Sequence, residues 1–421
     1  MNFLCLMFYR ILFNPVFVFM LLLFFLPVKK VRQTLFARKG LWKRFQKKIA
    51  HFENHKPLIW FHVSSAGEYL QVKYLIFEFY NNNYSVFITM TSISGFSWLE
   101  RESIPGFEFD FLPMDFTYNV HRLFKILKPS ALVVVKTDIW PNLIYGAKQR
   151  NIPRFLVCAP DRNFSSFGKR LFYSFIYSNF SGIFPISESS KKKYIDLLGS
   201  TKLIETIGDS KFDLVMERQS EKKITLTSLK PDDVCITLGS IWPQDMSVIG
   251  DSIQQALKEF PNLKMIIAPH ETGKSLQSLL LEYAAYNPVL YSDILKSGDY
   301  SKKFKVLLID TVGDLFFLYA NSIITYVGGG FSTGIHNILE PMAMNNVVIF
   351  GPRHDKFPEA NELMDRDCAF SIKNAEEFRV IFWKFLTNSL NAQKKAGAGR
   401  QYIQENTGST VKLFHQIQRF L

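Results

Sequence analysis

The chain has 421 residues, of which 48% are hydrophobic and 21% charged, and its formal net charge is +13 at pH 7. This composition excludes an intrinsically disordered chain, and the length predicts two or three domains. Residues 1–50 hold ten Lys and Arg side chains and no acid, so the rest of the chain is nearly balanced in charge. Because a nucleic-acid-binding protein carries its basic side chains on the folded body, no nucleic-acid partner is expected.

The first element along the chain is an apolar run over residues 11–28, and nine Lys and Arg side chains follow it between residues 29 and 48. A cleavable signal peptide has its positive charge before the apolar run, so this order argues against one. The run approaches the roughly 20 residues that span a bilayer, although Asn14 and Pro15 interrupt it. We expect a membrane anchor, as a span or a partly inserted segment, with an ordinary buried helix as the alternative. The positive-inside rule places the following residues in the cytoplasm, where the basic cluster can contact anionic lipid.

Short apolar runs alternate with helical patterns from residue 57 onward, a cadence typical of βα units and parallel sheets. Strands are predicted at 58–63, 84–90, 107–113, 131–136, 153–159, 182–187 and 203–208. After a polar linker at 214–232, further strands are predicted at 234–240, 264–269, 304–310, 322–329, 347–352 and 368–372. The fold class is therefore α/β with two doubly wound domains. We assign a membrane anchor to 1–28, a first domain to 29–215, a second to 216–400 and a C-terminal helix to 401–421.

The four cysteines, Cys5, Cys158, Cys235 and Cys368, lie far apart among apolar residues and form no CxxC pair. They are expected to be reduced thiols in a reducing compartment. The sequence also lacks an HExxH motif, a paired-histidine motif and an acidic pair at a predicted strand end. No metal site is therefore expected.

Doubly wound domains bind ligands at the carboxyl ends of their strands, so the residues that follow each predicted strand are candidates for a site. The first strand ends in HVSSAGEYL at 62–70. Its Glu68 is either an acid favoured by the dipole of a starting helix or a catalytic base. Lys136 and Asp138 follow the fourth strand, and Lys211 follows the seventh.

The richest strand end in the second half is GGGFSTGIHNILEP at 328–341. Glycines allow a ligand to approach the backbone, and Asn337 is expected to cap a helix that begins at Ile338 and presents N–H groups to an anion. Glu340, in the first turn, can accept hydrogen bonds from ribose hydroxyls. The segment predicts a nucleotide held by phosphate and sugar, although it matches neither a Walker A loop nor the GxGxxG fingerprint. The histidines His270, His336 and His354 are singletons, for which a structural role is the alternative.

Several segments in order resemble the 3-deoxy-D-manno-octulosonic acid (Kdo) transferases, glycosyltransferases of the GT-B architecture. They are HVSSAGE (62–68), FITMTS (87–92), FLPMD (111–115), TDIWPNLI (137–144), GDSKFD (208–213), IIAPHE (266–271), DTVGDL (310–315) and YVGGG with GIHNILEPMAMNNVVIFGP (326–352). The resemblance implies two Rossmann-like domains facing a cleft. It implies inverting transfer of Kdo from CMP-Kdo to a lipid A precursor (lipid IVA) in lipopolysaccharide core biosynthesis. The implied location is the cytoplasmic side of the cell inner membrane.

The resemblance also implies the roles of the site residues. Glu68 corresponds to the family's general base, and Lys211 would stabilise charge at the reacting centre. No cofactor besides the donor substrate CMP-Kdo is implied. The implied CMP contacts are Pro269 and His270, then Val312, Gly313 and Asp314, and then Asn337, Ile338, Leu339 and Glu340.

Departures from the family pattern concern the charges of the site. Lys136 stands where many members have an acid that supports the transition state, so three outcomes stay open. Asp138 takes part of that role, Lys136 serves the donor carboxylate, or the site works less well. His270 replaces an arginine, and a neutral imidazole binds phosphate more weakly than a guanidinium. The asparagine-alanine-arginine element that is common in the family after the fifth strand reads CAPDR here, so we expect its arginine at the shifted position of Arg162.

Two alternatives to this function stay open at the level of sequence. The first is a GT-B glycosyltransferase that uses a UDP-sugar donor, because the predicted fold and the glycine turn would allow it. The second is an inactive membrane-attached scaffold derived from such an enzyme, which Lys136 and His270 keep under consideration.

Overall fold

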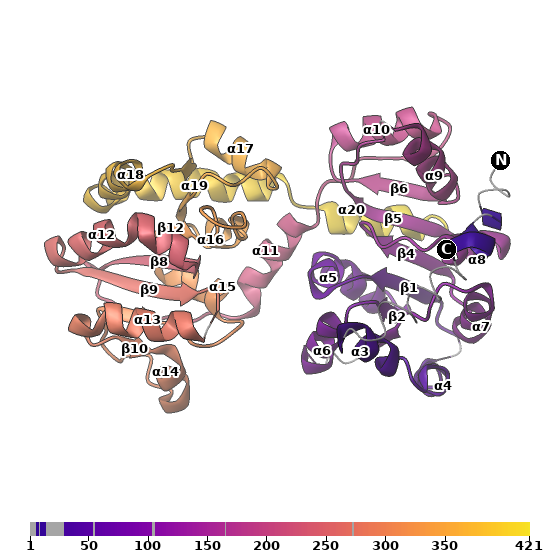
Figure 1. Ribbon diagram of the computed structural model, residues 1–421, viewed down its shortest axis with the longest axis horizontal. Coiled ribbons are helices and arrows are strands. Elements are labelled where there is room, and N and C mark those ends of the chain that lie inside the picture. Colours follow the sequence, from indigo (N-terminus) through magenta and orange to yellow (C-terminus); the bar gives the residue numbers. More distant parts are fainter. Residues whose placement is uncertain are drawn as a thin grey trace. The chain divides into compact units, whose positions relative to one another are not determined.

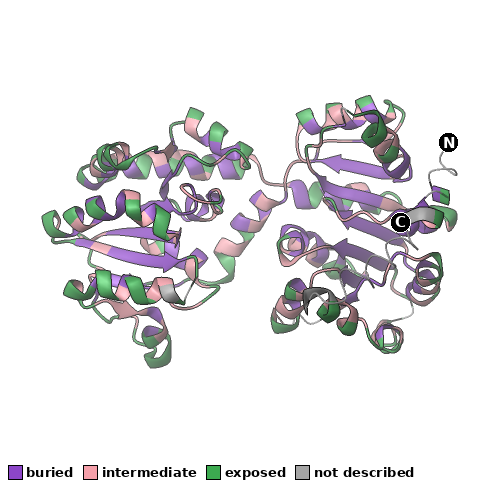
Figure 2. Cartoon of the chain, in the orientation of Figure 1, coloured by how far each residue is buried: buried purple, intermediate pink, exposed green. Residues whose placement is uncertain are grey.

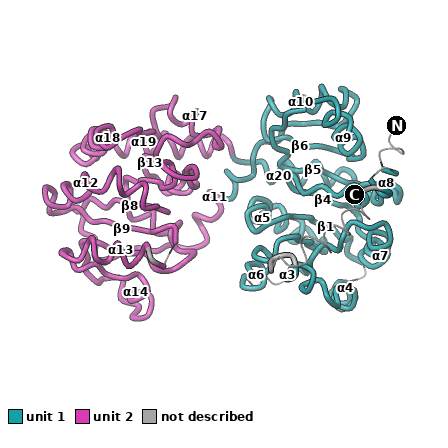
Figure 3. Tube along the Cα trace, viewed as in Figure 1, with its two compact units in different colours: residues 1–214, 407–421 teal, residues 215–406 magenta. Residues whose placement is uncertain are grey.

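The computed structural model of the protein describes residues 6–7, 9–13, 29–53, 55–102, 106–164, 166–271 and 273–421. The chain divides into two compact units (Figure 3). Unit 1 comprises residues 1–214 and 407–421, and unit 2 comprises residues 215–406. Each unit contains a seven-stranded sheet whose paired strands are parallel, with helices on both faces (Figure 1). The predicted α/β class with two parallel sheets is confirmed.

The sheet of unit 1 has the strand order β3-β2-β1-β4-β5-β6-β7. Its residues alternate between two cores, because successive side chains of a strand point to opposite faces. In β1, Leu58 and Trp60 pack on one face, and Ile59, Phe61 and Val63 pack on the other. Helices therefore cover both faces, and the strands are buried (Figure 2). The strands are β1 (Leu58–Val63), β2 (Ser85–Met90), β3 (Phe107–Phe111), β4 (Ala131–Val135), β5 (Arg154–Ala159), β6 (Gly182–Pro185) and β7 (Leu203–Ile204).

The helices of unit 1 follow the strands as the sequence pattern predicts, and the last helix of the chain joins them. They are α5 (Ala66–Asn81), α6 (Ile93–Glu102), α7 (Thr117–Leu127), α8 (Pro141–Gln149), α9 (Phe167–Tyr177), α10 (Glu188–Leu198) and α20 (Ser409–Gln418). The carboxylate of Asp213 accepts hydrogen bonds from the backbone of Gly408 and Thr410, at 2.5 and 2.8 Å. Phe414 of α20 packs edge-on against Phe79 of α5. These contacts fix the returning chain to the first sheet.

Unit 2 repeats the plan with the strand order β10-β11-β9-β8-β12-β13-β14. Its strands are β8 (Val234–Ile241), β9 (Leu263–Pro269), β10 (Val289–Leu290), β11 (Val306–Leu308), β12 (Ile324–Val327), β13 (Val347–Phe350) and β14 (Ala369–Ser371). The sequence analysis missed β10, an edge strand of two residues. The helices are α12 (Pro243–Glu259), α13 (Lys274–Glu282), α14 (Tyr291–Ser297), α15 (Leu315–Leu318), α16 (Leu339–Ala343), α17 (Pro358–Asp365), α18 (Ala375–Thr387) and α19 (Ser389–Glu405).

One further helix, α11 (Lys211–Glu221), begins in unit 1 and ends in unit 2. Its first residue, Lys211, belongs to the GDSKFD segment, and its later residues belong to unit 2. The helix therefore connects the two sheets along the chain, and its later turns occupy the first part of the polar linker predicted at 214–232.

Part of the basic N-terminal cluster packs onto unit 1. In α4 (Leu41–Ile49), Leu41 and Phe45 are buried, and Arg44 and Lys48 reach the buried carboxylate of Asp110 at 2.8 and 3.1 Å. The preceding helix, α3 (Lys29–Ala37), carries further basic residues.

Among the described helices, no apolar stretch is long enough to cross a bilayer. Most of the predicted anchor, residues 14–28, lies outside the described residues. The described residues before it include Tyr9–Phe13, and the Tyr9 hydroxyl donates a hydrogen bond of 3.1 Å to Asp115.

Candidate functional site

The carboxyl ends of β1 and β4 lie side by side in unit 1, at the point where the strand order reverses. Such a switch point is where doubly wound folds bind ligands. His62, near the end of β1, has its Nε2 3.2 Å from Oδ2 of Asp138, which follows β4. The hydroxyl of Thr91, which follows β2, donates to the same oxygen at 2.9 Å. The Nδ1 of His62 lies 2.9 Å from the hydroxyl of Thr89. Three strand ends therefore converge on one carboxylate.

This cluster determines the charge state of Asp138. Burial alone would raise the pKa of its carboxyl, but hydrogen bonds from His62 and Thr91 and the charge of His62 outweigh burial and lower the pKa below its ordinary value. Asp138 is therefore an ionised acceptor at neutral pH. The sequence analysis identified Asp138 but missed His62 and Thr91. For His62 a signal was available, because it opens the HVSSAGE motif at the end of an apolar strand.

Glu68 lies in the first turn of α5, as predicted. The N-cap residue Ser65 accepts a hydrogen bond from the Glu68 amide at 3.4 Å. In return, Oε2 of Glu68 accepts one from the Ser64 amide at 2.6 Å, and the residue is 7% exposed. The helix cap anticipated from the sequence is present, and it fixes the carboxylate against the turn.

Lys211, the first residue of α11, is tied to the helix that carries Glu68. Its ammonium group lies 3.3 Å from Oδ2 of Asp209, whose other carboxylate oxygen accepts a hydrogen bond of 2.5 Å from Gln71. The hydroxyl of Ser210 donates to the backbone carbonyl of Gln71 at 2.6 Å. Gln71 lies one helical turn after Glu68 in α5. The GDSKFD and HVSSAGE segments are thus joined within unit 1.

Lys136 occupies an unusual backbone conformation at the end of β4. Its φ is 56°, in the left-handed region that a residue with a side chain rarely adopts. The amide of Lys136 donates to the carbonyl of Val157 in β5 at 3.0 Å, which holds this conformation in place. Strained positions of this kind cluster at functional sites. The turn separates Lys136 by two residues from Asp138, and it places the lysine among the candidates at this sheet edge.

The glycine turn of unit 2 follows β12, which is adjacent to β8. A side chain at Gly328 would meet the backbone oxygen of Ser240 at 2.3 Å and the Cα of Ile241 at 2.6 Å. A side chain at Gly330 would meet the Cα of Gly351 at 2.5 Å. Close packing of backbone on backbone therefore requires these glycines. This packing accounts for the glycines without a ligand, and their role in making room for one stays a prediction.

Asp245, in the first turn of α12, holds the glycine turn in place. Its carboxylate accepts hydrogen bonds from the amides of Trp242 and Gly329, at 2.9 and 2.8 Å, and from the Tyr326 hydroxyl at 3.0 Å. Gly329 has a φ of 94°, which favours glycine. The strand ends of β8 and β12 are thus bound to each other through one buried acid.

His270, which follows Pro269 at the end of β9, belongs to an aromatic stack. Its ring lies 4.3 Å from that of Trp242 and 4.6 Å from that of His336, measured between ring centroids. The indole N–H of Trp242 donates to Nε2 of His336 at 3.1 Å. Treating His270 and His336 as singletons was therefore wrong. The two histidines are 66 residues apart, and they meet because β9, β8 and β12 are neighbours in the sheet.

The segment from Asn337 to Glu340 presents mainly its backbone and one acid. The helix begins at Leu339 with Ile338 as N-cap, and not at Ile338 as predicted. The Asn337 side chain still accepts a hydrogen bond from the Leu339 amide, at 3.0 Å. Ile338 and Leu339 are buried, so their side chains belong to the core. Burial raises the pKa of Glu340, and the guanidinium of Arg218, 3.4 Å away, opposes that shift.

The third predicted nucleotide segment is a turn after β11. Val312 is 93% exposed, and Gly313 has a φ of 113°. The carboxylate of Asp314 lies 2.9 Å from the ammonium group of Lys222, which directly follows α11. The same short stretch of chain thus supplies cations to both predicted nucleotide acids, Asp314 and Glu340.

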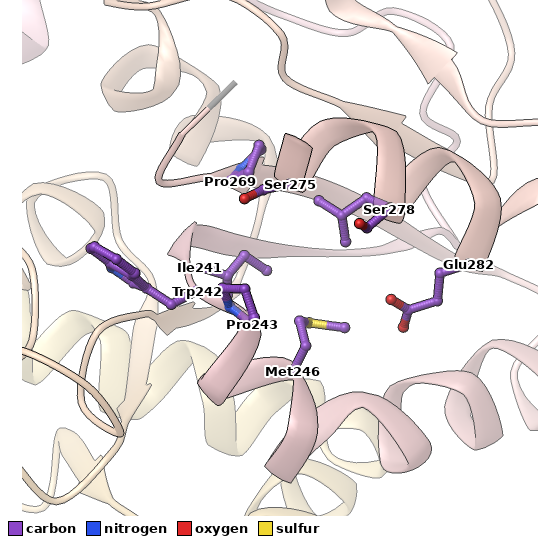
Figure 4. A pocket seen from close by; sticks show the side chains of 9 residues that line it. Ile241, Trp242, Pro243, Met246, Pro269, Ser275, Ser278 and Glu282 are labelled. Carbon is purple, nitrogen blue, oxygen red and sulfur yellow. The ribbon is translucent and has the colours of Figure 1, made fainter. Parts of the chain in front are cut away.

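A cavity of about 340 Å³ opens beside Trp242, at the carboxyl ends of β8 and β9 between α12 and α13 (Figure 4). Burial raises the pKa of the Glu282 carboxyl, and hydrogen bonds from Tyr283 and Gln254 oppose the shift. Trp242 belongs both to the cavity and to the aromatic stack, and the lining is mostly apolar. The lining residues are Ile241, Trp242, Pro243, Met246, Pro269, Ser275, Ser278, Leu279 and Glu282.

Comparison with known proteins identifies similar sequences. The family profile described as "3-Deoxy-D-manno-octulosonic-acid transferase (kdotransferase)" matches residues 37–214. The chain is 26% identical over 375 residues to the 3-deoxy-D-manno-octulosonic acid transferase of Haemophilus influenzae, covering 86% of this chain and 87% of that protein. It is 27% identical over 348 residues to the protein of the same description from Aquifex aeolicus, covering 80% of this chain and 87% of the other.

A solved structure shares the fold of this chain. The UDP-GlcNAc 2-epimerase of Neisseria meningitidis superposes with a TM-score of 0.58, covering 86% of this chain and 99% of that one. The sequence identity is 15%, so this likeness concerns the fold alone.

Proposed function

Because the chain belongs to the 3-deoxy-D-manno-octulosonic acid transferase family, we propose that it transfers Kdo from CMP-Kdo to a hydroxyl group of a lipid A precursor, lipid IVA. The observation that carries the proposal is the convergence of matched motifs within unit 1. His62 of HVSSAGE contacts Asp138 of TDIWPNLI across 76 residues, and Gln71 contacts Asp209 of GDSKFD across 138 residues. Chemistry-bearing residues thus meet at one sheet edge.

The proposed reaction is a single displacement that inverts the anomeric carbon. Glu68 removes the proton from the acceptor hydroxyl while the new glycosidic bond forms and the bond to the CMP phosphate breaks. Asp138, which His62 and Thr91 keep ionised, takes part of the transition-state support that many family members assign to an acid at position 136. Lys211 places a positive charge where the donor carboxylate and phosphate are anionic. Lys136 adds a second positive charge at the same sheet edge.

Unit 2 is the proposed donor-binding unit. Glu340 accepts hydrogen bonds from the ribose, Asp314 and the backbone of Val312 and Gly313 contact the base, and His270 faces the phosphate. This division of labour is that of the GT-B architecture, and the two seven-stranded parallel sheets of the chain are compatible with it. Apart from the donor CMP-Kdo and the lipid acceptor, the proposed reaction requires no cofactor.

We further propose that the enzyme acts at the cytoplasmic side of the cell inner membrane. The support is the order of residues in the sequence, an apolar run over 11–28 followed by nine basic residues. A lipid acceptor also favours an enzyme held at the membrane surface, where anionic lipid attracts the basic cluster.

The test is incorporation of labelled sugar by the purified full-length protein in detergent or liposomes. With lipid IVA as acceptor, label from CMP-Kdo is expected in the lipid fraction, and label from UDP-GlcNAc is not. Transfer from the UDP-sugar without transfer from CMP-Kdo would replace the proposal with a UDP-sugar glycosyltransferase. Transfer from neither donor, by protein that binds CMP, would favour an inactive scaffold.

A further inference from the structure

The stack of Trp242, His270 and His336 brings two imidazole rings together, with 4.6 Å between their centroids. We infer that His270 and His336 together form the binding site for the donor phosphate, and that the pair takes up a proton when the phosphate binds. The inference rests on the proposed function for the identity of the nucleotide. The preference for an anion follows from the residues of the stack.

The hydrogen bond from Trp242 defines the protonation of the ligand-free pair. The indole N–H is a donor without an acceptor lone pair, so Nε2 of His336, 3.1 Å away, must be unprotonated. Any proton that His336 carries as a neutral ring is therefore on Nδ1. The His270 ring stacks on both partners, at 4.3 and 4.6 Å between centroids. The resting pair is thus held in a geometry that suits two neutral rings.

The surroundings of the stack disfavour positive charge while no anion is bound. Burial lowers the pKa of His336, the neighbouring His270 lowers it further, and Asp245 opposes these effects. The Asp245 carboxylate is already bound to two backbone amides and the Tyr326 hydroxyl, so it is committed to the glycine turn. Two positive rings at 4.6 Å would repel each other. A bound phosphate supplies the missing negative charge and stabilises the protonated pair.

Other charged groups near the stack are directed elsewhere. The guanidinium of Arg353 donates to the backbone carbonyl of Ser332 in the loop after the glycine turn. Glu271 directly follows His270 and is exposed. Among the contacts of the described residues, Arg353 does not place its positive charge against the two rings, and Glu271 carries a negative charge. The site therefore differs from one built on arginine, whose charge does not depend on pH.

The position of the stack fits a phosphate. Its three residues follow β8, β9 and β12, and the carboxyl ends of these strands meet at the switch point of the second sheet. The backbone amide of His336 donates to the carbonyl of Gly328 at 3.1 Å, which ties the stack to the glycine turn. Ligands of doubly wound folds bind at this edge. The pair thus lies where the proposed donor places its anionic group.

Proton uptake makes the affinity depend on pH in one direction. A group whose pKa rises on binding favours the complex at low pH, and the affinity falls as the pH increases. With one proton taken up, the Kd of a phosphodiester is expected to rise about tenfold for each pH unit between pH 6.5 and 8.5. Free CMP is unsuitable as the probe, because the second pKa of a phosphate monoester is near 6. The 5′-methyl phosphate esters of cytidine and uridine keep a single negative charge over this range.

The experiment is calorimetric titration of the full-length protein with both esters from pH 5.5 to 8.5, in buffers that differ in ionisation enthalpy. We expect uptake of about one proton per cytidine ester at pH 7.5. The variant His270→Arg should bind with a Kd that is nearly independent of pH. His270→Phe, which keeps an aromatic ring in the stack, should bind at least tenfold more weakly at pH 6 without proton uptake. The control His354→Gln alters a histidine outside the stack and should retain the wild-type pH dependence.

Each outcome decides the inference. A Kd independent of pH with no proton uptake in the wild-type protein would overturn it, and so would an unchanged pH dependence in a folded His270→Arg variant. Proton-linked binding of the uridine ester in preference to the cytidine ester would support the pair and refute CMP-Kdo as the donor. Binding of neither ester at any pH, by protein with a normal thermal unfolding transition, would overturn the inference.

Discussion

The two sheet edges hold their candidate residues in different ways. In unit 1, side chains from motifs distant in the sequence bind one another directly, as His62 binds Asp138 at 3.2 Å. In unit 2, the predicted nucleotide acid Glu340 is paired with Arg218, a cation from the connecting helix, at 3.4 Å. At the first edge, candidate side chains thus hold one another, whereas at the second a cation from the connecting helix holds the predicted nucleotide acid.

This difference predicts a division of effects. Changes at the edge of unit 1 should lower kcat, because the residues there act on the reacting atoms. Changes at the edge of unit 2 should raise the Kd of the nucleotide and leave kcat at saturation nearly unchanged. A variant of unit 1 that raises the Kd of the nucleotide but leaves kcat unchanged would contradict this division. So would a variant of unit 2 that lowers kcat but leaves the Kd unchanged.

The largest effect is expected for Glu68→Gln, which retains the size of the side chain and removes its basicity. General base catalysis contributes about 10²- to 10⁴-fold, so kcat for Kdo transfer should fall by that factor. The Kd for CMP should stay within about twofold of wild type, because this residue belongs to unit 1. Steady-state kinetics and calorimetry check both. A rate near that of wild type would show that Glu68 is a helix cap and no more.

A smaller effect is expected for Arg218→Met in unit 2. Methionine keeps apolar packing against Phe316, whose ring lies 4.4 Å from the Arg218 guanidinium carbon. Without the guanidinium, only the hydrogen bond from Asn337 opposes the rise in the pKa of Glu340 that burial causes, so the carboxylate becomes a poorer acceptor for ribose. The Kd for CMP should rise about tenfold, which corresponds to about 1.4 kcal/mol. Calorimetry at pH 7 measures the change, and a comparison with pH 6, where the change should be larger, uses the 5′-methyl phosphate ester of cytidine.

The matched control is Lys222→Met, which removes the partner of Asp314. That ion pair is partly exposed, and exposed pairs contribute little. The Kd should change by less than about threefold. If Lys222→Met raised the Kd for CMP as much as Arg218→Met does, Arg218 would be one of several interchangeable positive charges.

Stability should also depend on pH through a buried acid of unit 1. Burial raises the pKa of Asp115 to about 7, although the amides of Asn142 and Leu143 and the Tyr9 hydroxyl oppose the shift. An unfolded aspartate has a pKa of about 3.9, so between these values the native state binds more protons than the unfolded chain. The free energy of unfolding should therefore fall as the pH rises from about 4 to about 7.

Thermal unfolding of Asp115→Asn tests this dependence. Its transition should shift less than that of the wild type between pH 5 and pH 8, because asparagine does not titrate. The variant loses an acceptor for the backbone of α8, so the comparison concerns the slope and not the absolute midpoint. Parallel slopes for the two proteins would contradict the assignment.

The smallest effect is expected for Tyr9→Phe. The change removes a hydrogen bond of 3.1 Å from the N-terminal segment to Asp115. The free energy of unfolding should fall by about 1 kcal/mol, the usual contribution of one hydrogen bond. In the Asp115→Asn background the effect should be smaller, because the two residues interact. Denaturant titration of the four proteins measures this coupling.

Much of the fold could be read from local patterns. The run LIWFHV predicts a strand at 58–63, and β1 has those bounds, since a strand covered on both faces is a continuous apolar run. The two-residue β10 gave no such pattern. The return of α20 to unit 1 depends on tertiary contacts, namely those of Asp213 with the 408–410 turn, which no periodicity encodes.

The candidate sites were predictable only in part. Single motifs at strand ends located Glu68 and Asp138, because the carboxyl ends of parallel strands carry the ligand sites. The pairing of His270 with His336 depends on strand order, which brings residues 66 positions apart into contact. The role of Arg218 was equally hidden, since an arginine in a polar, helical stretch gives no sign of a partner in another segment.

The central claim is that this chain transfers Kdo from CMP-Kdo to lipid IVA. The most direct measurement is mass spectrometry of the lipid recovered after incubation of the full-length protein with both substrates. The account predicts lipid IVA with its mass increased by one or more Kdo residues, and no such product with Glu68→Gln in the same time. Unmodified lipid IVA from a wild-type protein that binds CMP, or a product that carries a different sugar, would contradict it.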